Sequence, residues 1–257
     1  MTHWWTELYD DHLADVLLDG GSPGETDATL GFLVEHLALA QGDRVFDQCS
    51  GTGRLSIPLA RWGAEVVGVE QAARYVERAR AAAAAAGVMP LFTVGDAFDH
   101  VPDRPCAAAI NWWTSFGYLA HDDGNARMLR RAFEALAPGG RFAIDTPNVP
   151  GLYAAFRPSE ITRRATPGGE VVMLRESQFD LARGLLHKRW TFVLPDGRRV
   201  EHPSTIKLYS PDRMVALLAS VGFTELRVFG GVDGRPIALD SPRCIVVGAR
   251  PGVERGR

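Results

Sequence analysis

The sequence predicts an α/β protein with a Rossmann-like, doubly wound and mostly parallel sheet of seven strands. Two observations carry this prediction. Between Arg44 and Asp145, short apolar segments alternate with helical ones, which is typical of parallel strands joined by helices. After Asp145 the segments become long, β-rich and separated by short turns. Such strands must pair antiparallel because parallel strands need long crossovers. We therefore expect an antiparallel β extension over residues 168–210, inserted after the fifth strand.

The N-terminal part predicts helices. Apolar residues at helical spacing indicate a helix over Thr6–Leu18, "GGSPGET" indicates a loop, and Asp27–Leu39 indicates a second helix. We expect residues 1–40 to form a helical lid or cap, with Trp4 and Trp5 packed beneath it. Residues 41–257 would then form one α/β domain that includes the β extension.

The remaining elements follow in order along the chain. Glycine closes two of the expected helices, as is common at a left-handed C-terminal cap, and the alanine run at 81–86 is a strong helix former. Strands are expected over 44–48, 65–70, 91–96, 106–111, 141–145, 225–230 and 243–249, and helices over 54–63, 71–87, 125–140 and 211–222.

Composition excludes several classes of function. The net charge is −3 and no basic run is present, which argues against a nucleic-acid partner. No apolar run approaches a membrane span, and the first residues do not resemble a signal peptide. The cysteines Cys49, Cys106 and Cys244 lie far apart, so we expect buried reduced thiols and no metal site. The chain is thus expected to be cytoplasmic, with no membrane partner.

Polar residues follow the expected strands at their carboxyl ends. Asp47 ends the first strand before a turn that contains Gly51, Glu70 ends the second, Asp96 follows the third, and Asn111 ends the fourth. Open α/β sheets bind ligands at this edge. A carboxylate at Glu70 suits the two hydroxyls of a ribose, and one at Asp96 suits an adenine amino group. Acids at three successive strand ends favour an adenosine ligand with a positive charge over a diphosphate.

The order of the motifs resembles the class I S-adenosylmethionine-dependent methyltransferases, whereas the patterns G-x-G-x-x-G and G-x-x-x-x-G-K-[ST] are absent. "DQCSGTG" matches the family's first motif, "VVGVEQ" the second, "GDAF" the third and "LAPGGRFAID" the segment before the fifth strand. The resemblance implies S-adenosylmethionine as cofactor and S-adenosylhomocysteine as product. It implies these cofactor-binding residues: Tyr9, Asp47, Cys49, Gly51, Gly53, Glu70, Gln71, Asp96, Ala97 and Asn111.

Cys49 departs from the family's first motif, which has glycine at that position. A cysteine is only modestly larger than alanine, and we expect it to be tolerated if its backbone φ is not positive.

A second, looser resemblance points to the acceptor. "TSFGYLAHDD" and "PDGRRVEHPSTIKLYSPDRMVALLASVGF" resemble the small-molecule methyltransferases of antibiotic biosynthesis, of which the sugar N,N-dimethyltransferases are one branch. The resemblance implies secondary metabolism and an oxygen or nitrogen acceptor rather than carbon. The bulky "NWWT" argues against a sugar-phosphate or nucleotide-sugar acceptor. We expect Trp112, Trp113 and Tyr118 to bind the acceptor, with His121 as proton acceptor and Tyr118 as the residue that orients it.

Other functions remain open at this point. A protein of this fold can bind the cofactor only to regulate a partner, or can use it for another transfer or for a cyclisation. Release of S-adenosylhomocysteine would separate methyl transfer from these alternatives. A homodimer also remains open.

Overall fold

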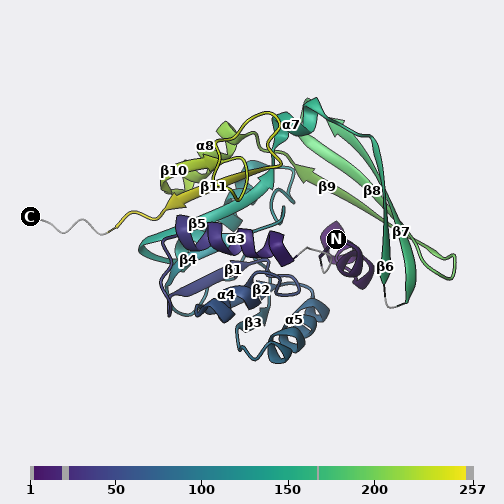
Figure 1. Cartoon of the computed structure of the whole chain (residues 1–257). Helices are drawn as coiled ribbons and strands as arrows, with labels where there is room; N and C mark the ends of the chain where they lie inside the picture. Colours follow the sequence, from purple (N-terminus) through teal and green to yellow (C-terminus); the bar gives the residue numbers. More distant parts are fainter. Residues whose placement is uncertain (1–2, 19–22, 167, 253–257) are drawn as a thin grey trace, which may run out of the picture.

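The structure is a computed structural model that describes residues 3–18, 23–166 and 168–252. Its main sheet has seven strands in the order β10-β11-β5-β4-β1-β2-β3, and only β11 runs against its neighbours (Figure 1). This confirms the predicted fold class. The strands are β1 (Arg44–Gln48), β2 (Glu65–Glu70), β3 (Leu91–Val94), β4 (Cys106–Asn111), β5 (Leu136–Pro147), β10 (Thr224–Phe229) and β11 (Arg243–Ala249).

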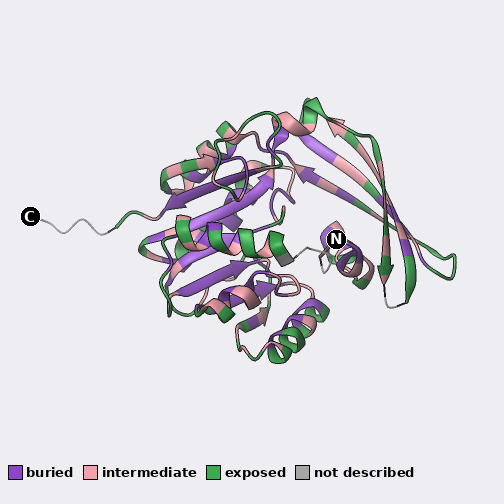
Figure 2. Ribbon diagram, in the orientation of Figure 1, coloured by how far each residue is buried: buried purple, intermediate pink, exposed green. Residues whose placement is uncertain are grey.

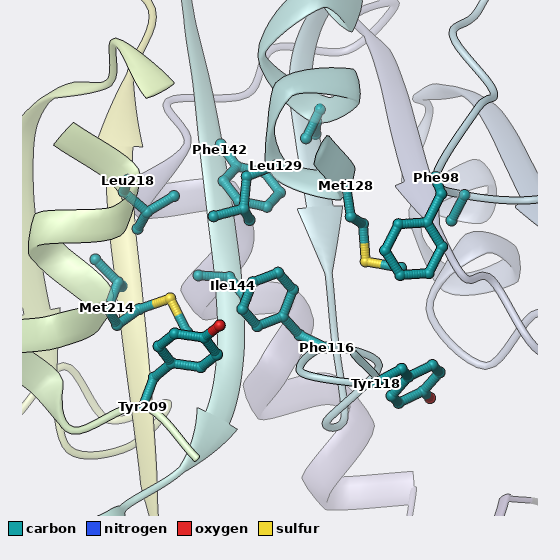
Figure 3. Close-up of a cluster of buried hydrophobic side chains, with 14 of the residues drawn as sticks. Phe98, Phe116, Tyr118, Met128, Leu129, Phe142, Ile144, Tyr209, Met214 and Leu218 are labelled. Atoms are coloured by element: carbon teal, nitrogen blue, oxygen red, sulfur yellow. The ribbon is translucent and has the colours of Figure 1, made fainter. Parts of the chain in front are cut away.

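Helices cover both faces of this sheet, which is why its central strands are apolar on both sides. On one face, Leu59 and Phe32 pack against Val45 and Ile110. On the other, helices from two distant parts of the chain pack against β5, where Leu129 and Leu218 lie over Phe142 (Figure 3). The helices are α3 (Pro23–His36), α4 (Ser56–Trp62), α5 (Ala73–Ala85), α6 (Asp122–Ala135), α7 (Val149–Ala154) and α8 (Pro211–Val221).

The antiparallel extension is a separate sheet of four strands in the order β6-β7-β8-β9. It begins earlier than the expected residue 168. Strand β6 was not predicted because "SEITRRAT" has a single large apolar residue, and that residue, Ile161, is 67% exposed. The strands are β6 (Ser159–Thr166), β7 (Gly169–Asp180), β8 (Leu185–Val193) and β9 (Arg199–Lys207).

The N-terminal helix is broken where one continuous helix was expected. The segments are α1 (Trp4–Leu8), α2 (Asp11–Leu13) and a π-helical turn, η1 (Ala14–Leu18). The break falls at Asp10, whose side chain accepts a hydrogen bond from the Leu13 backbone N–H at 2.9 Å. Such a cap starts a new helix rather than continuing the old one. Helix α3 likewise begins at Pro23, before the expected Asp27, because proline suits the first helical turn.

The N-terminal helices lie between the two sheets (Figure 1). Leu13 and Val16 pack against Met173 and Phe192 of the extension. At its other end the extension joins the core of the main domain, for example through Leu186. Much of β8 is accordingly buried, whereas β6 alternates between exposed and half-buried residues (Figure 2). None of the helices within residues 3–18, 23–166 and 168–252 has the length and apolar character that a membrane crossing requires.

Candidate active site

A pocket opens at the carboxyl edge of the parallel sheet, beneath the N-terminal helices. The space within and above it amounts to about 890 Å³, which includes open solvent at its mouth. The predicted site residues that line it are Tyr9, Asp47, Cys49, Gly51, Glu70, Gln71, Asp96, Ala97, Trp112, Trp113 and Tyr118.

Asp47 anchors the turn that follows β1. Its carboxylate is buried and accepts a hydrogen bond from the Ser56 hydroxyl, at the start of α4, at 2.6 Å. Burial raises the pKa of Asp47 to about 6, against the opposing effect of that hydrogen bond, and the Glu70 carboxylate nearby adds to the rise. Asp47 therefore fixes the strand to the helix as well as facing the pocket.

Glu70 joins the turn to the start of α5. One carboxylate oxygen accepts a hydrogen bond from the Gly51 N–H at 3.1 Å, and the other accepts one from the Ala72 N–H at 2.9 Å. Burial raises its pKa, and the backbone hydrogen bonds oppose that rise. A carboxylate has about four lone-pair directions, so Glu70 keeps acceptor capacity for a ligand in the pocket.

Two further residues hold the same wall in place. Asp96 accepts a hydrogen bond from the Phe98 N–H at 2.8 Å, which fixes its carboxylate beside Ala97. The Gln71 side-chain amide donates to the Trp5 carbonyl at 3.3 Å. The second contact ties the strand ends to the N-terminal helix above them.

The backbone of Cys49 does not have the non-positive φ that the sequence analysis required for a cysteine at this turn. Its φ is +67°, in the left-handed region that glycine adopts without cost and other residues rarely adopt. Glycine is therefore the expected residue at this turn, and the chain holds a cysteine there under strain. Burial raises the pKa of the Cys49 thiol well above its usual value, so the thiol is protonated and unreactive.

Aromatic rings form the wall that faces the sheet. The hydroxyls of Tyr9 and Tyr118 hydrogen-bond to each other, and Tyr118 lies between Trp4 and Trp5, with ring centroids 4.9 Å and 5.5 Å away. Burial raises the pKa of both tyrosines. Both hydroxyls are consequently neutral at ordinary pH and can orient a bound group without taking up its proton.

The two tryptophans after β4 have different surroundings. Trp112 is 7% exposed and packs near Phe32 in the core, while its edge reaches the pocket. Trp113 is 37% exposed, and the Arg54 guanidinium lies over its ring at 4.4 Å from the centroid.

Arg54 was not among the predicted site residues. It lines the pocket, and its two terminal nitrogens are shielded from solvent with no hydrogen-bond partner among the described residues. Its one ion pair, to Glu25, is long at 3.8 Å. The only signal in the sequence is a cation directly after "GTG", which was assigned to the following helix. A buried guanidinium of this kind favours a carboxylate in the pocket.

Three predicted residues are not among those that line the pocket. His121 is exposed at the start of α6, so it does not reach the pocket as a proton acceptor. Asn111 is buried and donates to the Gln48 side-chain oxygen at 3.1 Å and to the Ser115 carbonyl at 3.3 Å. Gly53 lies in close packing, since a Cβ there would meet the Phe92 ring at 3.1 Å.

No metal centre is found in the part of the chain that the structure describes: no three His, Cys, Asp or Glu side chains gather as ligands there. The polar and aromatic groups that line the pocket are the strand-end carboxylates, the guanidinium of Arg54 and the aromatic wall.

Comparisons with known proteins agree with this geometry. Residues 45–140 match the family described as "Methyltransferase domain". Among solved structures, the CcbJ methyltransferase from Streptomyces caelestis has a TM-score of 0.78 and 23% sequence identity, with 95% of this chain and 98% of that chain covered. At this identity the likeness concerns the fold.

Curated relatives match shorter parts of the chain. A ubiquinone biosynthesis O-methyltransferase from Xanthomonas euvesicatoria is 30% identical over 142 residues, or 54% of this chain and 58% of that protein. A 23S rRNA (uracil(1939)-C(5))-methyltransferase from a Shewanella species is 47% identical over 64 residues, which is 24% of this chain. The match spans only 14% of that protein's length. The resemblance to S-adenosylmethionine-dependent methyltransferases is thus confirmed for the fold and for the domain at residues 45–140.

Proposed function

We propose that this chain, whose residues 45–140 match the methyltransferase domain of the S-adenosylmethionine-dependent class, transfers the methyl group of that cofactor to a small molecule. The acceptor atom is oxygen or nitrogen rather than carbon, and the pathway is one of secondary metabolism. The observation that carries the proposal is the Glu70 carboxylate. Backbone N–H groups hold it at the end of β2, at the wall of the pocket.

The residues present fit the cofactor. Glu70 keeps acceptor capacity for ribose hydroxyls, and Asp96 suits an amino group on the adenine beside Ala97. The terminal nitrogens of Arg54, which make no hydrogen bond among the described residues, suit the carboxylate of the amino-acid part. The aromatic wall at Tyr9 suits a sulfonium cation. When bound, S-adenosylmethionine supplies an electrophilic methyl group.

The remaining chemistry falls to the protein's own residues. Methyl transfer needs the acceptor aligned and water excluded, so positioning contributes most of the rate. Trp5, Tyr118 and the N-terminal helices exclude water from the sheet edge. The neutral Tyr118 hydroxyl orients the acceptor by a hydrogen bond. A protonated amine acceptor therefore loses its proton before it reaches this wall.

A small acceptor agrees with the enclosed form of the site. The antiparallel extension and the N-terminal helices lie beside the sheet edge where a large polymer would otherwise approach (Figure 1). The net charge of −3 also disfavours an RNA substrate like that of the Shewanella relative.

Residues 1–40 would act as the lid. Three unpaired cysteines suit a cytoplasmic location. A homodimer stays an expectation that light scattering would check.

The first experiment measures cofactor binding by calorimetry. We expect Glu70→Ala to weaken S-adenosylmethionine binding by roughly 1.5–3 kcal/mol, the scale of hydrogen bonds to a charged group. Glu65→Ala is the matched control because Glu65 begins the same strand, at the end away from the pocket, and is exposed. Wild-type affinity in Glu70→Ala, with an unchanged thermal melt, would remove Glu70 from the site.

The second experiment follows the product. Small molecules that carry hydroxyl or amino groups are incubated with the cofactor, and S-adenosylhomocysteine is measured. Its release with a methylated acceptor supports methyl transfer. Conversion of a substrate without S-adenosylhomocysteine would show another use of the cofactor. Binding with no conversion of any acceptor would favour a regulatory protein.

A further inference from the structure

The inner face of the antiparallel extension has a polar band between two apolar ends. Side chains on alternate positions of a strand share a face. Leu186, Lys188, Trp190 and Phe192 of β8 therefore point the same way. Phe192 packs on the N-terminal helices and Leu186 joins the core of the main domain. Lys188 lies between these two contacts.

Neighbouring strands continue this band. In the register of the sheet, Lys188 stands between Ser177 of β7 and Ser204 of β9. The next row holds Arg175, Trp190 and His202. The inner face thus offers hydroxyls, cations and an indole where a purely structural sheet would place apolar side chains.

Lys188 is the cation in this band without a counter-ion. In the part of the chain that the structure describes, its ammonium makes no ion pair or hydrogen bond, and its one contact is the Trp190 ring, 5.3 Å away. The chain has 28 lysine and arginine residues, of which only Lys188 and Lys207 are lysines. Arginine keeps its proton in proteins, whereas a lysine amine can be neutral. Of these two residue types, only lysine can therefore take up a proton when it binds an anion.

The other charges that face Lys188 are already paired. Arg175 of β7 forms an ion pair with Glu160 of β6. Arg243 of β11 makes two hydrogen bonds to Asp145, at 2.7 Å and 2.8 Å. On β9, His202 bonds to the Asp10 carboxylate at 3.2 Å. Burial first, and then the charges of Arg175 and Arg243, lower the pKa of Lys188 to about 7.

Arg243, whose charge acts on Lys188, also belongs to a hydrogen-bonded group beside the pocket. Its guanidinium donates to the Thr114 hydroxyl at 2.9 Å, and its partner Asp145 accepts from the Trp113 N–H at 3.1 Å. Trp113 lines the pocket. The residue whose charge acts on Lys188 is thus hydrogen-bonded, through Asp145, to a residue of the pocket wall.

We propose that Lys188 binds an anionic group of the acceptor, a carboxylate or a phosphate, on the inner face of the extension. The proposal rests on the proposed function and names its substrate class: a small molecule with a negative charge apart from the atom that is methylated. An anion there provides the counter-ion that Lys188 lacks, and the Trp190 indole supplies a flat apolar surface beside it.

Anion binding at Lys188 also takes up a proton. Near pH 7 the amine is partly neutral in the free protein, and a bound anion favours its charged form. Affinity for the anion therefore falls as the pH rises from 7 to 9. Arg175 and Arg243 stay charged over this range and do not contribute to the change.

The test uses the full chain labelled with ¹³C at the lysine ε-carbon, which gives two signals. Lys207 is the internal control because its ammonium donates to the Arg183 carbonyl at 2.7 Å in an exposed position. Lys188→Gln assigns the signals. The pH titration is recorded without acetate or phosphate, then with acetate, and then with inorganic phosphate. Sodium chloride is adjusted so that the ionic strength is the same in all three.

We expect the Lys188 signal to titrate near pH 7, and its midpoint to rise by about one unit with the recognised anion. A rise with acetate alone identifies a carboxylate, and a rise with phosphate alone identifies a phosphate. Equal movement of the Lys207 midpoint, or no movement of Lys188 with either anion, would overturn the proposal. Cofactor binding is measured separately, so failure of the anion site and failure of the methyltransferase function give different results.

Kinetics give a second check once an acceptor is known. Lys188→Gln should raise KM for the acceptor about tenfold or more, the scale of losing a hydrogen bond to a charged group. Lys188→Arg should keep KM low but remove its dependence on pH between 7 and 9. The Kd for S-adenosylmethionine should stay unchanged in both. An unchanged KM in Lys188→Gln would contradict the proposal.

Discussion

The two walls of the pocket are built in different ways. The sheet wall comes from neighbouring strand ends, and its carboxylates bond within one short stretch of chain: Asp96 accepts from Phe98 two residues on, and Glu70 accepts from Ala72 two residues on and from Gly51 nineteen residues back. The opposite wall comes from segments far apart in the chain. Tyr9 bonds to Tyr118 across 109 residues, and Asp10 bonds to His202 across 192. The first wall follows from local sequence, and the second exists only after the chain has folded.

This difference has a consequence for function. The sheet wall carries carboxylates fixed by backbone N–H groups, which suits a cofactor with a constant shape. The other wall is held by ring contacts and by the apolar packing of Leu8 and Leu13 on the extension. Elements with fewer and more distant contacts open at lower free energy than a sheet core. We infer that the second wall admits the acceptor, while the first stays closed.

The comparison predicts different effects for two leucine truncations. Leu59, on α4, and Leu13, on α2, are both buried, and Leu→Ala at such positions costs about 2–5 kcal/mol. Leu59→Ala should lower the free energy of global unfolding by that amount. Leu13→Ala should instead promote local opening of residues 3–18. Hydrogen exchange measured by mass spectrometry separates the two.

In Leu13→Ala, amides of the N-terminal helices and of the adjoining strand β7 should exchange faster, while those of β1 and β4 keep their protection. In Leu59→Ala, the slowest amides of β1 and β4 should lose protection together. Equal loss in β1 and β4 for both variants would mean that the two regions unfold as one unit, and the distinction would fail.

Sequence reasoning recovered the sheet wall for a physical reason. A parallel strand buried on both faces is a continuous apolar run, and the residue that ends it must lie at the ligand-binding edge. Asp47, Glu70 and Asp96 could therefore be placed without knowledge of tertiary contacts. The parallel direction of strands β1 to β5 follows from the same alternation with helices.

The residues that sequence reasoning missed depend on long-range packing. Strand β6 has a polar sequence and pairs only because β7 lies beside it. His121 was placed at the cleft from its loop, but the start of α6 carries it to the surface. Arg54 and Lys188 look like ordinary surface cations in the sequence. Only the folded chain shows that Arg54 lies over the Trp113 ring and that Lys188 lies beside the Trp190 ring of the extension.

The sheet wall can be tested through the pH dependence of stability. The folded state raises the pKa of Asp47 to about 6, whereas an unfolded aspartate titrates near 3.9. The folded state holds this proton more tightly. The contribution of Asp47 to stability is thus fully present below about pH 4 and is lost as the pH rises through about 6.

Asp47→Asn removes this titration. The free energy of unfolding of the wild type, minus that of the variant, should fall by about 2–3 kcal/mol between pH 4 and pH 7. Urea unfolding of both proteins at several pH values measures the difference. Asp240→Asn is the control because Asp240 is exposed. A difference between wild type and Asp47→Asn that stays constant with pH would show that Asp47 is not buried as an acid.

The smallest expected effect concerns the wall built from distant segments, where the hydroxyls of Tyr9 and Tyr118 bond to each other. Tyr9→Phe or Tyr118→Phe alone leaves one buried hydroxyl without this partner, which costs about 1–2 kcal/mol. The double variant removes both hydroxyls, so it should cost less than the two single changes added together. Urea unfolding of the four proteins should give a coupling free energy of about 1 kcal/mol.

The control combines Tyr9→Phe with Tyr153→Phe. The Tyr153 ring is 42% exposed and packs on Phe179, so the effects of these two changes should add. If the Tyr9 and Tyr118 changes also add, the hydroxyl pair does not join the N-terminal helix to the loop after β4. The second wall would then be held by ring packing alone.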